Sequence, residues 1–406
     1  METTSKVTLL DSKRLLLGVT GSIAAYKAAD LASRLTKAGA LVDVVLTKAA
    51  QQFVTPLTFQ SVTGRRAFAD DDLWGSDAHI LHVSLAQDID LLAVAPITAN
   101  TMAKLAQGGA DNLLTVLALA ADRPLLLAPA MDAGMFDHPA TQANLQTLKD
   151  RGAYIAGPTE GRMASGLVGL GRMLEPEELL GHIRLVLGRK GPLAGKKVVV
   201  TAGGTREPID PVRVVANRSS GKQGFALAQA ALDLGGEVML IAGPVHLPTP
   251  VGATRVDVRT AREMKEATLQ AIMQADVLIM AAAVADFRPK DASSDKIKRR
   301  KGVPEIKLEP TDDILGEVVN HKTKPGVIVG FAAESQDLEK NAKAKLKEKS
   351  LSLVVANDIT AADAGFAVDT NRVVLIDAGG KTDELPLMSK VEVAEKVMAR
   401  IIDLLD

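Results

Sequence analysis

Glycine, hydroxyl and amide residues follow three apolar runs in the first half of the chain, and residues of these types can bind an anionic ligand. Glycine lets the backbone turn tightly after a strand, and a serine at the start of the next helix lies beside free N–H groups that bind phosphate. The glycine spacing differs from GxGxxG, so it does not predict a dinucleotide, and a capped helix without a ligand explains this motif equally well. The candidate binding residues are Gly21 and Ser22 after the first run, Thr47 at the end of the second, and Thr98 and Asn100 after the third.

The second half contains two glycine-rich segments and two clusters of basic residues. The segments TAGGT and NRSSGKQG are loops that can approach an anion closely, although neither is a Walker A motif. One basic cluster spans residues 290–301, and the other spans residues 340–349, where Lys345 and Lys349 share one face of a predicted helix. Most lysine runs are solvated surface. Two clusters with few acidic partners in one domain instead favour a triphosphate with its magnesium ion.

The elements that position these residues alternate between apolar strands and helices in both halves. This alternation predicts α/β domains with parallel sheets, and ligands of open α/β sheets bind at the carboxyl ends of the strands. The pattern stops near Leu187, and the Gly- and Pro-rich residues 189–195 are typical of a linker, so the predicted domains are residues 1–188 and 196–406. The predicted strands are residues 15–19, 42–47, 91–95, 125–128, 197–201, 237–241, 277–281, 327–330, 372–376 and 381–387, and the predicted helices include residues 22–37, 224–234 and 390–405.

Composition excludes several classes of protein. The 406 residues include 48 basic and 49 acidic side chains, so no overall charge attracts nucleic acid or an anionic membrane. There is no cysteine, which rules out disulfides, thiolate metal sites and cysteine nucleophiles. No apolar run reaches the ~18–20 residues of a membrane span, and the N-terminal residues lack the apolar segment of a signal peptide. The sequence therefore predicts a cytoplasmic protein without nucleic-acid or membrane partners.

The first half resembles the flavoprotein family of cysteine decarboxylases, and phosphopantothenoylcysteine decarboxylases in particular. The resemblance is carried by GSIAAYK, PITANTMAKLAQGGADNLL, PAM and the GRM of Gly171–Met173, in this order, over roughly residues 14–187. It implies a flavodoxin-like or Rossmann-like domain that binds FMN. The residues it implies for FMN are Gly21, Ser22, Thr47, Thr98 and Asn100.

A histidine before the third strand is a further feature of this decarboxylase family. Both His79 and His82 precede the strand, and the spacing from His82 to Pro96 matches the family's pattern, so His82 is the predicted catalytic residue. A lone histidine of this kind is otherwise a surface residue of a helix. In the implied reaction the flavin oxidises the thiol-bearing carbon of the substrate so that carbon dioxide can leave, while the protein orients the substrate and supplies protons.

Two residues depart from the decarboxylase pattern. The family's PAMN is Pro129–Asp132 here, and the Ala-Cys-Gly of its flap loop has Ser165 in the central position. An ionised Asp132 would repel the substrate carboxylate that the family's amide binds, and a serine hydroxyl is a much weaker acid than a thiol of pKa about 8.5. We predict that Asp132 and Ser165 share the acid–base role of the family's cysteine. The alternative is a first domain that binds flavin but acts only as an oligomerisation scaffold.

The second half resembles phosphopantothenate–cysteine ligases of the bacterial, CTP-using type, which have a Rossmann-like α/β domain. TAGGTREPIDPVRVVANRSSGKQG is the longest matching stretch, and AAAVADFRP, DKIKR, GFAAE and VVANDI follow in the family's order. The resemblance implies that CTP activates the carboxylate of 4'-phosphopantothenate as an acyl-cytidylate, which the amine of cysteine then attacks. Lys296 would offset charge on the transferring phosphate, and Asn217, Arg213 and Ala282 would serve the acyl-cytidylate. The implied CTP-binding residues are Asp286, Lys296, Asp312, Asp313, Ile314, Leu315, Phe331, Lys345 and Lys349.

Together the two resemblances imply two consecutive steps of coenzyme A synthesis, because the product of the ligase is the substrate of the decarboxylase. FMN is the expected cofactor, and Mg2+ is expected mainly on the phosphates of CTP. The resemblance also implies trimers of flavin domains, dimers of ligase domains and assembly into dodecamers, so a homo-oligomer is expected. A nicotinamide oxidoreductase with two Rossmann-like units also fits the alternation of strands and helices, but the glycine spacing disfavours it.

Overall fold

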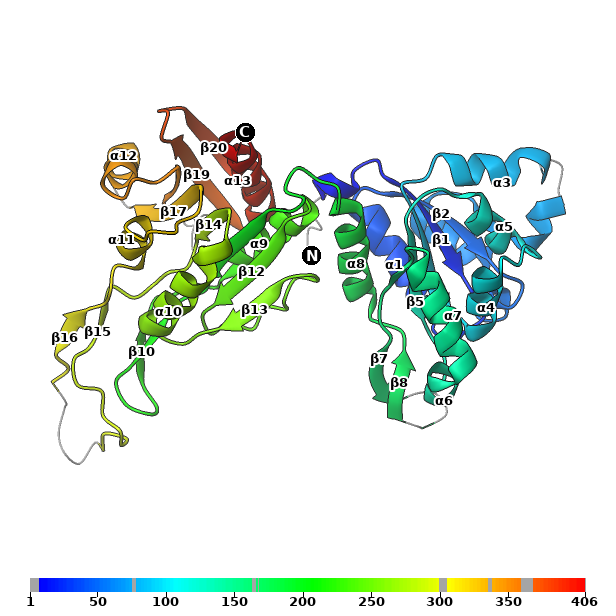
Figure 1. Cartoon of the computed structure of the whole chain (residues 1–406), viewed down its shortest axis with the longest axis horizontal. Helices are drawn as coiled ribbons and strands as arrows, with labels where there is room; N and C mark the ends of the chain where they lie inside the picture. The colour runs from blue at the N-terminus through cyan, green and yellow to red at the C-terminus, as the bar shows by residue number, and fades with distance from the viewer. Residues whose placement is uncertain are drawn as a thin grey trace. The chain divides into compact units, whose positions relative to one another are not determined.

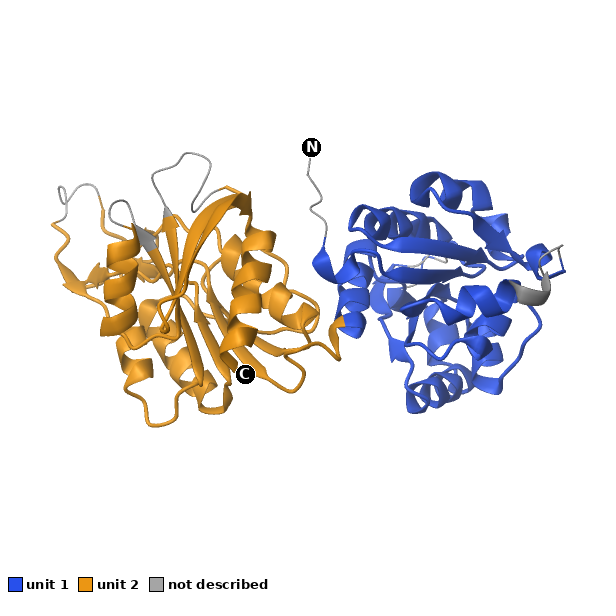
Figure 2. Ribbon diagram, turned by 90° about the horizontal axis from the view of Figure 1, so that it is seen from above, with its two compact units in different colours: residues 1–187 blue, residues 188–406 orange. Residues whose placement is uncertain are grey.

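The computed structural model of the chain has two compact units, Met1–Leu187 and Gly188–Asp406, which Figure 2 distinguishes by colour. Each unit is built around its own main sheet, with helices on both faces (Figure 1). The α/β fold class expected from the alternation of strands and helices is confirmed. The structure describes residues 7–74, 78–162, 166, 168–298, 305–334, 338–358 and 368–405.

The sheet of the first unit has six parallel strands in the order β3-β2-β1-β4-β5-β6. Successive residues of a strand point to opposite faces, so Leu15 and Leu17 pack in one core while Leu16 packs in the other. The strand order reverses between β1 and β4, and ligands of open α/β sheets bind outside such a switch point. The strands are β1 (Arg14–Val19), β2 (Leu41–Leu46), β3 (Ala67–Ala69), β4 (Leu91–Ile97), β5 (Leu125–Pro129) and β6 (Tyr154–Ile155).

Helices cover both faces of this sheet. The apolar residues Ala28, Leu31 and Leu35 of α1 lie at helical spacing and pack in the same core as Leu15, together with α2 and α8. Helices α3 to α7 contribute to the core on the opposite face. A small antiparallel hairpin, β7 (Thr159–Arg162) and β8 (Val168–Arg172), precedes the last helix. The helices are α1 (Ala25–Lys37), α2 (Pro56–Thr63), α3 (Ala78–Gln87), α4 (Ala99–Gln107), α5 (Leu113–Ala120), α6 (Ala133–Asp137), α7 (Pro139–Asp150) and α8 (Pro176–Gly188).

The sheet of the second unit has eight strands in the order β13-β12-β9-β14-β17-β18-β19-β20. The strands from β13 to β18 are parallel, and β19 and β20 extend the sheet as an antiparallel hairpin. The strands are β9 (Lys197–Ala202), β12 (Glu237–Ala242), β13 (Thr254–Asp257), β14 (Val277–Met280), β17 (Val327–Glu334), β18 (Leu353–Asp358), β19 (Thr370–Asp377) and β20 (Thr382–Ser389).

In the described part of the second unit, five α-helices and two small sheets accompany the main sheet. Helices α10 (Ala261–Ala271), α11 (Ile314–Val319) and α12 (Leu338–Glu348) pack on one face of the main sheet, and α9 (Lys222–Asp233) and α13 (Lys390–Leu405) pack against each other on the opposite face. The two small antiparallel sheets contact one another and extend from the main sheet (Figure 1). We call them, with their loops, the arm. The arm contains β10 (Arg206–Pro208), β11 (Val214–Ala216), β15 (Phe287–Pro289) and β16 (Leu308–Pro310).

The predicted main-sheet strands all occur, and the last helix has both of its predicted ends. Helix α1 begins at Ala25 rather than Ser22, because Ser22 and its neighbours form hydrogen-bonded turns before the helix. The predicted linker, residues 189–195, consists of turns in which Leu193 is fully buried and donates its backbone N–H to Leu234 O at 2.8 Å. Within the described part of the chain, no helix is long and apolar enough to cross a membrane.

Candidate functional sites

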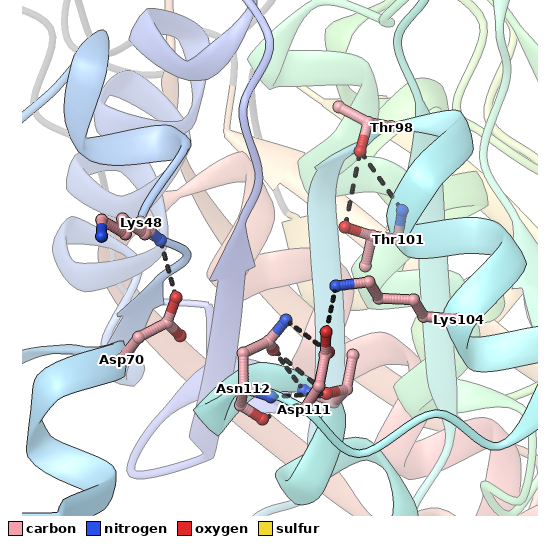
Figure 3. Close-up of polar contacts among 8 residues, drawn as sticks. Lys48, Asp70, Thr98, Thr101, Lys104, Asp111 and Asn112 are labelled. Atoms are coloured by element: carbon pink, nitrogen blue, oxygen red, sulfur yellow. Dashed lines mark hydrogen bonds and ion pairs between the residues drawn. The ribbon is translucent and has the colours of Figure 1, made fainter.

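Hydroxyl groups meet at the carboxyl edge of the first unit's sheet, beside the switch point. Thr20 Oγ1 accepts the backbone N–H of Thr98 at 3.0 Å and donates to Pro96 O at 2.8 Å, so it joins the loop after β1 to the loop after β4. Thr98 caps α4, since its Oγ1 accepts the backbone N–H of Thr101 at 3.4 Å (Figure 3). Thr47, buried after β2, accepts a backbone N–H at 3.2 Å. Three of the loops that sequence analysis singled out therefore lie at one edge.

The glycine before α1 is required by close packing. A Cβ on Gly21 would lie 2.5 Å from the Cβ of Ala49, so a larger residue would separate the loops after β1 and β2. Ser22 Oγ accepts the backbone N–H of Ala24 at 3.3 Å, and Asn100 is exposed in the first turn of α4. Neutral hydrogen-bonding groups beside the start of a helix suit the phosphate and the uncharged ring system of a flavin nucleotide. The predicted set Gly21, Ser22, Thr47, Thr98 and Asn100 thus fits FMN.

The segment between α4 and α5 is held by its own side chains. Lys104 Nζ donates to Asp111 Oδ2 at 2.6 Å (Figure 3), and this hydrogen bond holds the pKa of Asp111 below its ordinary value. Asn112 caps α5 by accepting the backbone N–H of Thr115 at 3.0 Å. Several residues of the motif PITANTMAKLAQGGADNLL, such as Thr98 and Asn112, therefore build the two helix starts.

A cavity of about 570 Å³ lies between the start of α1, the loop after β5 and the β7–β8 hairpin. Ser22 and Asp132 both line it, so the structure brings these two predicted residues together. Asp132 also caps α6, because its Oδ1 accepts the backbone N–H of Gly134 at 3.1 Å. The backbone N–H of Met131 donates to Gly171 O at 3.0 Å, which ties this loop to β8.

Three basic residues of this cavity were missed by sequence analysis, namely Lys27, Arg162 and Arg172. The side chain of Lys27 is only 6% exposed, and its Nζ donates to Met173 O at 3.0 Å and to Glu175 Oε1 at 2.8 Å. These bonds anchor α1 to the segment after β8, and the bond from Lys27 holds the pKa of Glu175 below its ordinary value. The signal in the sequence was a lysine within the GSIAAYK motif on a helix face that is otherwise apolar.

One remaining candidate of the first unit, the histidine of α3, is not among the residues that line this cavity. His82 lies on α3 and is absent from the cavity lining. Its Nδ1 is buried and has no hydrogen-bond partner among the described residues, which is uncommon for a buried polar atom. Ser165 and the side chain of His79 lie outside what the structure describes.

The second unit has a cavity of about 540 Å³ at the carboxyl edge of β14, β17 and β18, next to the start of α9. It collects residues from segments that are far apart in the sequence. All the ligase residues predicted above line it except Arg213 and Lys296. The lining members of that set are Asn217, Ala282, Asp286, Asp312, Asp313, Ile314, Leu315, Phe331, Lys345 and Lys349.

Lys345, on α12, and Lys349, directly after its end, both line this cavity instead of forming a solvated surface. Lys345 Nζ donates to Phe331 O at 2.8 Å, and Lys349 Nζ lies 2.6 Å from Asp313 Oδ2. The pKa of Lys349 is raised, chiefly by its bond to Asp313. Asp312 pairs with Lys265 Nζ at 2.7 Å, and this bond lowers its pKa. Both carboxylates are therefore neutralised by lysines, and among the described residues no group of three or more acidic or histidine side chains could hold a metal ion.

Asn217 joins two loops at the mouth of the same cavity. Its Nδ2 donates to Ala283 O at 3.3 Å and to Val284 O at 3.1 Å. The amide nitrogen thus holds the loop after β11 against the loop after β14, which contains Ala282. Ala282 is fixed in turn, since its backbone N–H donates to Thr201 Oγ1 at 3.2 Å.

Arg213 and Lys296 lie on the arm and not among the residues that line the cavity. Arg213 Nη2 donates to the backbone carbonyl of Ile297 at 3.0 Å. This hydrogen bond ties the β10–β11 hairpin to the loop that carries Lys296. Both side chains are exposed.

Sequence analysis missed a second group of lining residues, on the α9 and α13 side of the cavity. Lys390, the first residue of α13, is 6% exposed and donates to Val368 O at 2.5 Å, and its burial lowers its pKa. Gln223 Nε2 donates to Lys390 O at 3.1 Å, and Asn371 Nδ2 donates to Gln223 Oε1 at 3.4 Å. Asn357 Oδ1 is buried without a partner in the described structure. Pairing of β18 and β19 across the sheet brings these residues together, and no local sequence pattern signals it.

Comparisons with known proteins match both units. The family described as flavoprotein matches residues 3–188, and the family described as DNA/pantothenate metabolism flavoprotein C-terminal domain matches residues 193–405. The chain is 45% identical over 396 residues to the coenzyme A biosynthesis bifunctional protein CoaBC of Bacillus subtilis (strain 168), covering 97% of each chain. It is 45% identical over 361 residues to a cysteine/cysteine sulfinic acid decarboxylase of an unknown prokaryotic organism, covering 86% of this chain and 99% of that protein. Among solved structures, the C-terminal domain of a CoaBC protein is 41% identical and covers 53% of this chain and 98% of that one, with a TM-score of 0.46.

Proposed function

The chain belongs to the family of coenzyme A biosynthesis bifunctional proteins, and from this membership we propose that its two units catalyse consecutive reactions. The second unit joins 4'-phosphopantothenate to cysteine at the expense of CTP. The first unit decarboxylates the resulting phosphopantothenoylcysteine to 4'-phosphopantetheine. The observation that carries the proposal is the cavity of the second unit, because segments from residue 217 to residue 390 contribute anion-binding groups to it.

In the ligase reaction the carboxylate of 4'-phosphopantothenate attacks the α-phosphate of CTP and expels pyrophosphate. The amine of cysteine then attacks the mixed anhydride and releases CMP. Lys345 and Lys349, with the segment from Asp312 to Leu315 and with Asp286 and Phe331, would bind the nucleotide. Lys296 would stabilise the negative charge that grows on the transferring phosphate. Asn217, Arg213 and Ala282 would hold the acyl-cytidylate for the second attack.

Magnesium is proposed to enter the second unit with the nucleotide. A triphosphate supplies several oxygen ligands, and Mg2+ usually keeps several waters and binds through substrate phosphates. The start of α9, with Ser219 and Ser220 before it, offers backbone N–H groups to phosphate oxygens beside the same cavity. The preference for CTP is tested by supplying ATP, GTP and UTP in its place.

In the decarboxylase reaction FMN would be held by Gly21, Ser22, Thr47, Thr98 and Asn100. The bound flavin supplies the redox chemistry that makes loss of carbon dioxide possible. The protein's own part is to orient the substrate and to move protons. We propose that Asp132 and Ser165 share the proton donation, and that His82 assists, since its Nδ1 is buried without a partner among the described residues.

Incubation of the purified chain with CTP, cysteine, 4'-phosphopantothenate and magnesium, followed by mass spectrometry, tests both halves. We expect pyrophosphate, CMP and 4'-phosphopantetheine. Accumulation of phosphopantothenoylcysteine without carbon dioxide release would support the second candidate, a ligase whose flavin unit is only a scaffold, which the Asp132 and Ser165 replacements favour. A colourless protein that does not consume CTP would refute the whole proposal.

We further propose a cytoplasmic homo-oligomer, with trimers of the first unit, dimers of the second and a dodecamer of both. Exposed large apolar side chains on both units support self-association. The first unit exposes Ile23, Tyr26, Phe53 and Leu57, and the arm of the second unit exposes Val212, Val214, Phe287 and Leu308. Light scattering of the purified chain tests the predicted mass.

A further inference from the structure

A buried carboxylate lies at the turn of the β10–β11 hairpin, in the arm of the second unit. The side chain of Asp210 is fully buried, whereas its partner Arg213 is 45% exposed. Asp210 lies outside the cavity lining and was not singled out from the sequence. Burying an ionised carboxylate costs free energy unless hydrogen-bond donors surround it. The donors around Asp210 therefore show which groups this carboxylate positions.

Both oxygens of this carboxylate are saturated with donors. Oδ1 accepts the backbone N–H groups of Val212 at 2.9 Å and Arg213 at 2.8 Å. Oδ2 accepts Arg213 Nε at 3.0 Å, Arg213 Nη2, and the backbone N–H of Ile297 at 3.1 Å. These bonds, first of all those from the Arg213 side chain, hold the pKa of Asp210 well below its ordinary range, so the group is an anion.

The two oxygens of the Asp210 carboxylate bind different parts of the arm. The contacts of Oδ1 are those of any aspartate that closes a tight turn on its own backbone. The contacts of Oδ2 reach the guanidinium of Arg213 and a residue 87 positions away in the chain, Ile297. Arg213 and Ile297 are also joined directly, since Arg213 Nη2 donates to Ile297 O at 3.0 Å. The backbone N–H of Ser293 adds a bond to Ile209 O at 3.0 Å.

The loop fixed in this way carries Lys296, the residue directly before Ile297. Ser293 Oγ donates to Asp295 O at 2.7 Å, so the loop has a defined turn just before the lysine. A single anion therefore sets the relative position of a guanidinium and of the backbone beside an ammonium group. Without it, the Arg213 side chain and the backbone N–H of Ile297 would lose the acceptor that they share, and only the bonds from Arg213 Nη2 to Ile297 O and from Ser293 N–H to Ile209 O would join the two segments.

We propose that Asp210 is a positioning residue for the ligase reaction, because its carboxylate holds Arg213 and the Lys296 loop in one arrangement. This inference rests on the ligase function proposed for the second unit. The hydrogen-bond partners of the Asp210 carboxylate are Val212, Arg213 and Ile297, none of which lines the cavity, so we infer that it acts through the two cations rather than on the substrates. Its loss should lower the rate of carboxylate activation and leave nucleotide affinity nearly unchanged.

The test compares Asp210→Asn with a matched control, Asp377→Asn, in the full chain. Asp377 is also a buried aspartate of the second unit, paired with Arg400 at 2.6 Å and accepting a backbone N–H from Lys381 at 3.0 Å, but it lies outside the cavity lining. Pyrophosphate release is measured with CTP, magnesium and 4'-phosphopantothenate, with and without cysteine, and the thermal midpoint is measured for each protein. For Asp210→Asn we expect kcat to fall by about tenfold or more while KM for CTP stays within about twofold and the midpoint is nearly unchanged. For Asp377→Asn we expect a lower midpoint and kcat within about twofold of the parent chain.

A double-mutant cycle separates positioning from general damage. Because Asp210 acts in part through Arg213, Asp210→Asn should lower kcat by a smaller factor in the Arg213→Ala background than in the parent chain. If the two substitutions lowered kcat by independent factors that multiply in the double variant, the inference would be overturned. It would also be overturned if Asp210→Asn kept the full kcat of the parent chain, or if its kcat fell only together with its thermal midpoint. A parent chain that releases no pyrophosphate would refute the proposed ligase function and the inference with it.

Discussion

The sharpest steric test of the first unit is the substitution Gly171→Ala. Gly171 lies in β8 and accepts the backbone N–H of Met131 at 3.0 Å, so it fixes the loop that presents Asp132 to the cavity. A Cβ at position 171 would lie 2.3 Å from Met131 O, whereas real Cβ atoms essentially never approach closer than 3.0 Å. The obstacle is a backbone atom, which cannot turn aside as a flexible side chain can.

The size of the effect follows from this overlap. The two segments must separate by about 0.7 Å to relieve it, and a displacement approaching 1 Å at a reacting group costs about 100-fold in rate. We therefore expect Gly171→Ala to lower carbon dioxide release from phosphopantothenoylcysteine by about two orders of magnitude. The ligase activity of the second unit should be unchanged, which provides an internal standard in the same preparation.

Gly134→Ala is the matched control, because Gly134 belongs to the same loop region. A Cβ there would meet only Asp132 Oδ1, at 3.7 Å, an ordinary contact, and the backbone N–H that Asp132 accepts is retained. We expect this variant to keep decarboxylation within about twofold of the parent chain. The reasoning would be refuted if Gly171→Ala released carbon dioxide at the parent rate with its flavin spectrum intact, or if both variants lost activity equally.

Three further substitutions address the second unit. Lys296→Gln should abolish pyrophosphate release, and normal release would dismiss a role for Lys296 in charge stabilisation. Asn217→Asp would set a carboxylate oxygen against the carbonyls of Ala283 and Val284, so we expect pyrophosphate release to persist while transfer to cysteine stalls; normal turnover to phosphopantothenoylcysteine would contradict this. Arg400→Met should lower the free energy of unfolding of the second unit by about 3–5 kcal/mol, because it leaves Asp377 buried and unpaired, and a denaturant midpoint equal to that of the parent chain would show that the pair contributes little.

The central strands of the main sheets, such as β1, β4 and β14, were predictable from the sequence because they are buried on both faces and therefore read as continuous apolar runs. The strands β3, β6, β13 and β18 were not predicted. The arm was not predicted. Its strands have three residues each and expose Val214 and Leu308, so they carry neither an apolar run nor a period of two. The start of α1 was placed three residues too early, because the hydroxyl of Ser22 serves a turn before the helix instead of the helix itself.

The residues of the candidate sites also fall into two groups, those that the sequence could place and those that only the structure places. Residues directly after strands, such as Thr98 and Ala282, could be expected at the carboxyl edge from the parallel topology alone. Lys345 and Lys349 shared a predicted helix face, although only the structure joins them to Phe331 and Asp313. Lys390 could not be anticipated, because it reaches the cavity through the antiparallel pairing of β18 with β19 and the packing of α13 on α9.

We propose that the second unit separates two tasks, nucleotide binding and carboxylate activation, that the sequence motifs present together. The cavity, formed by the rigid sheet edge and its helices, contains neutralised carboxylates and lysines and is suited to binding a nucleotide. Arg213 and Lys296 lie instead on the arm, where Asp210 fixes them relative to each other. If binding and activation depend on different parts of the fold, a variant of the arm should still bind CTP at equilibrium while its pyrophosphate release is lost. Equal loss of both in Lys296→Gln would mean that the arm belongs to the binding site, and the division of tasks argued from the cavity lining would be wrong.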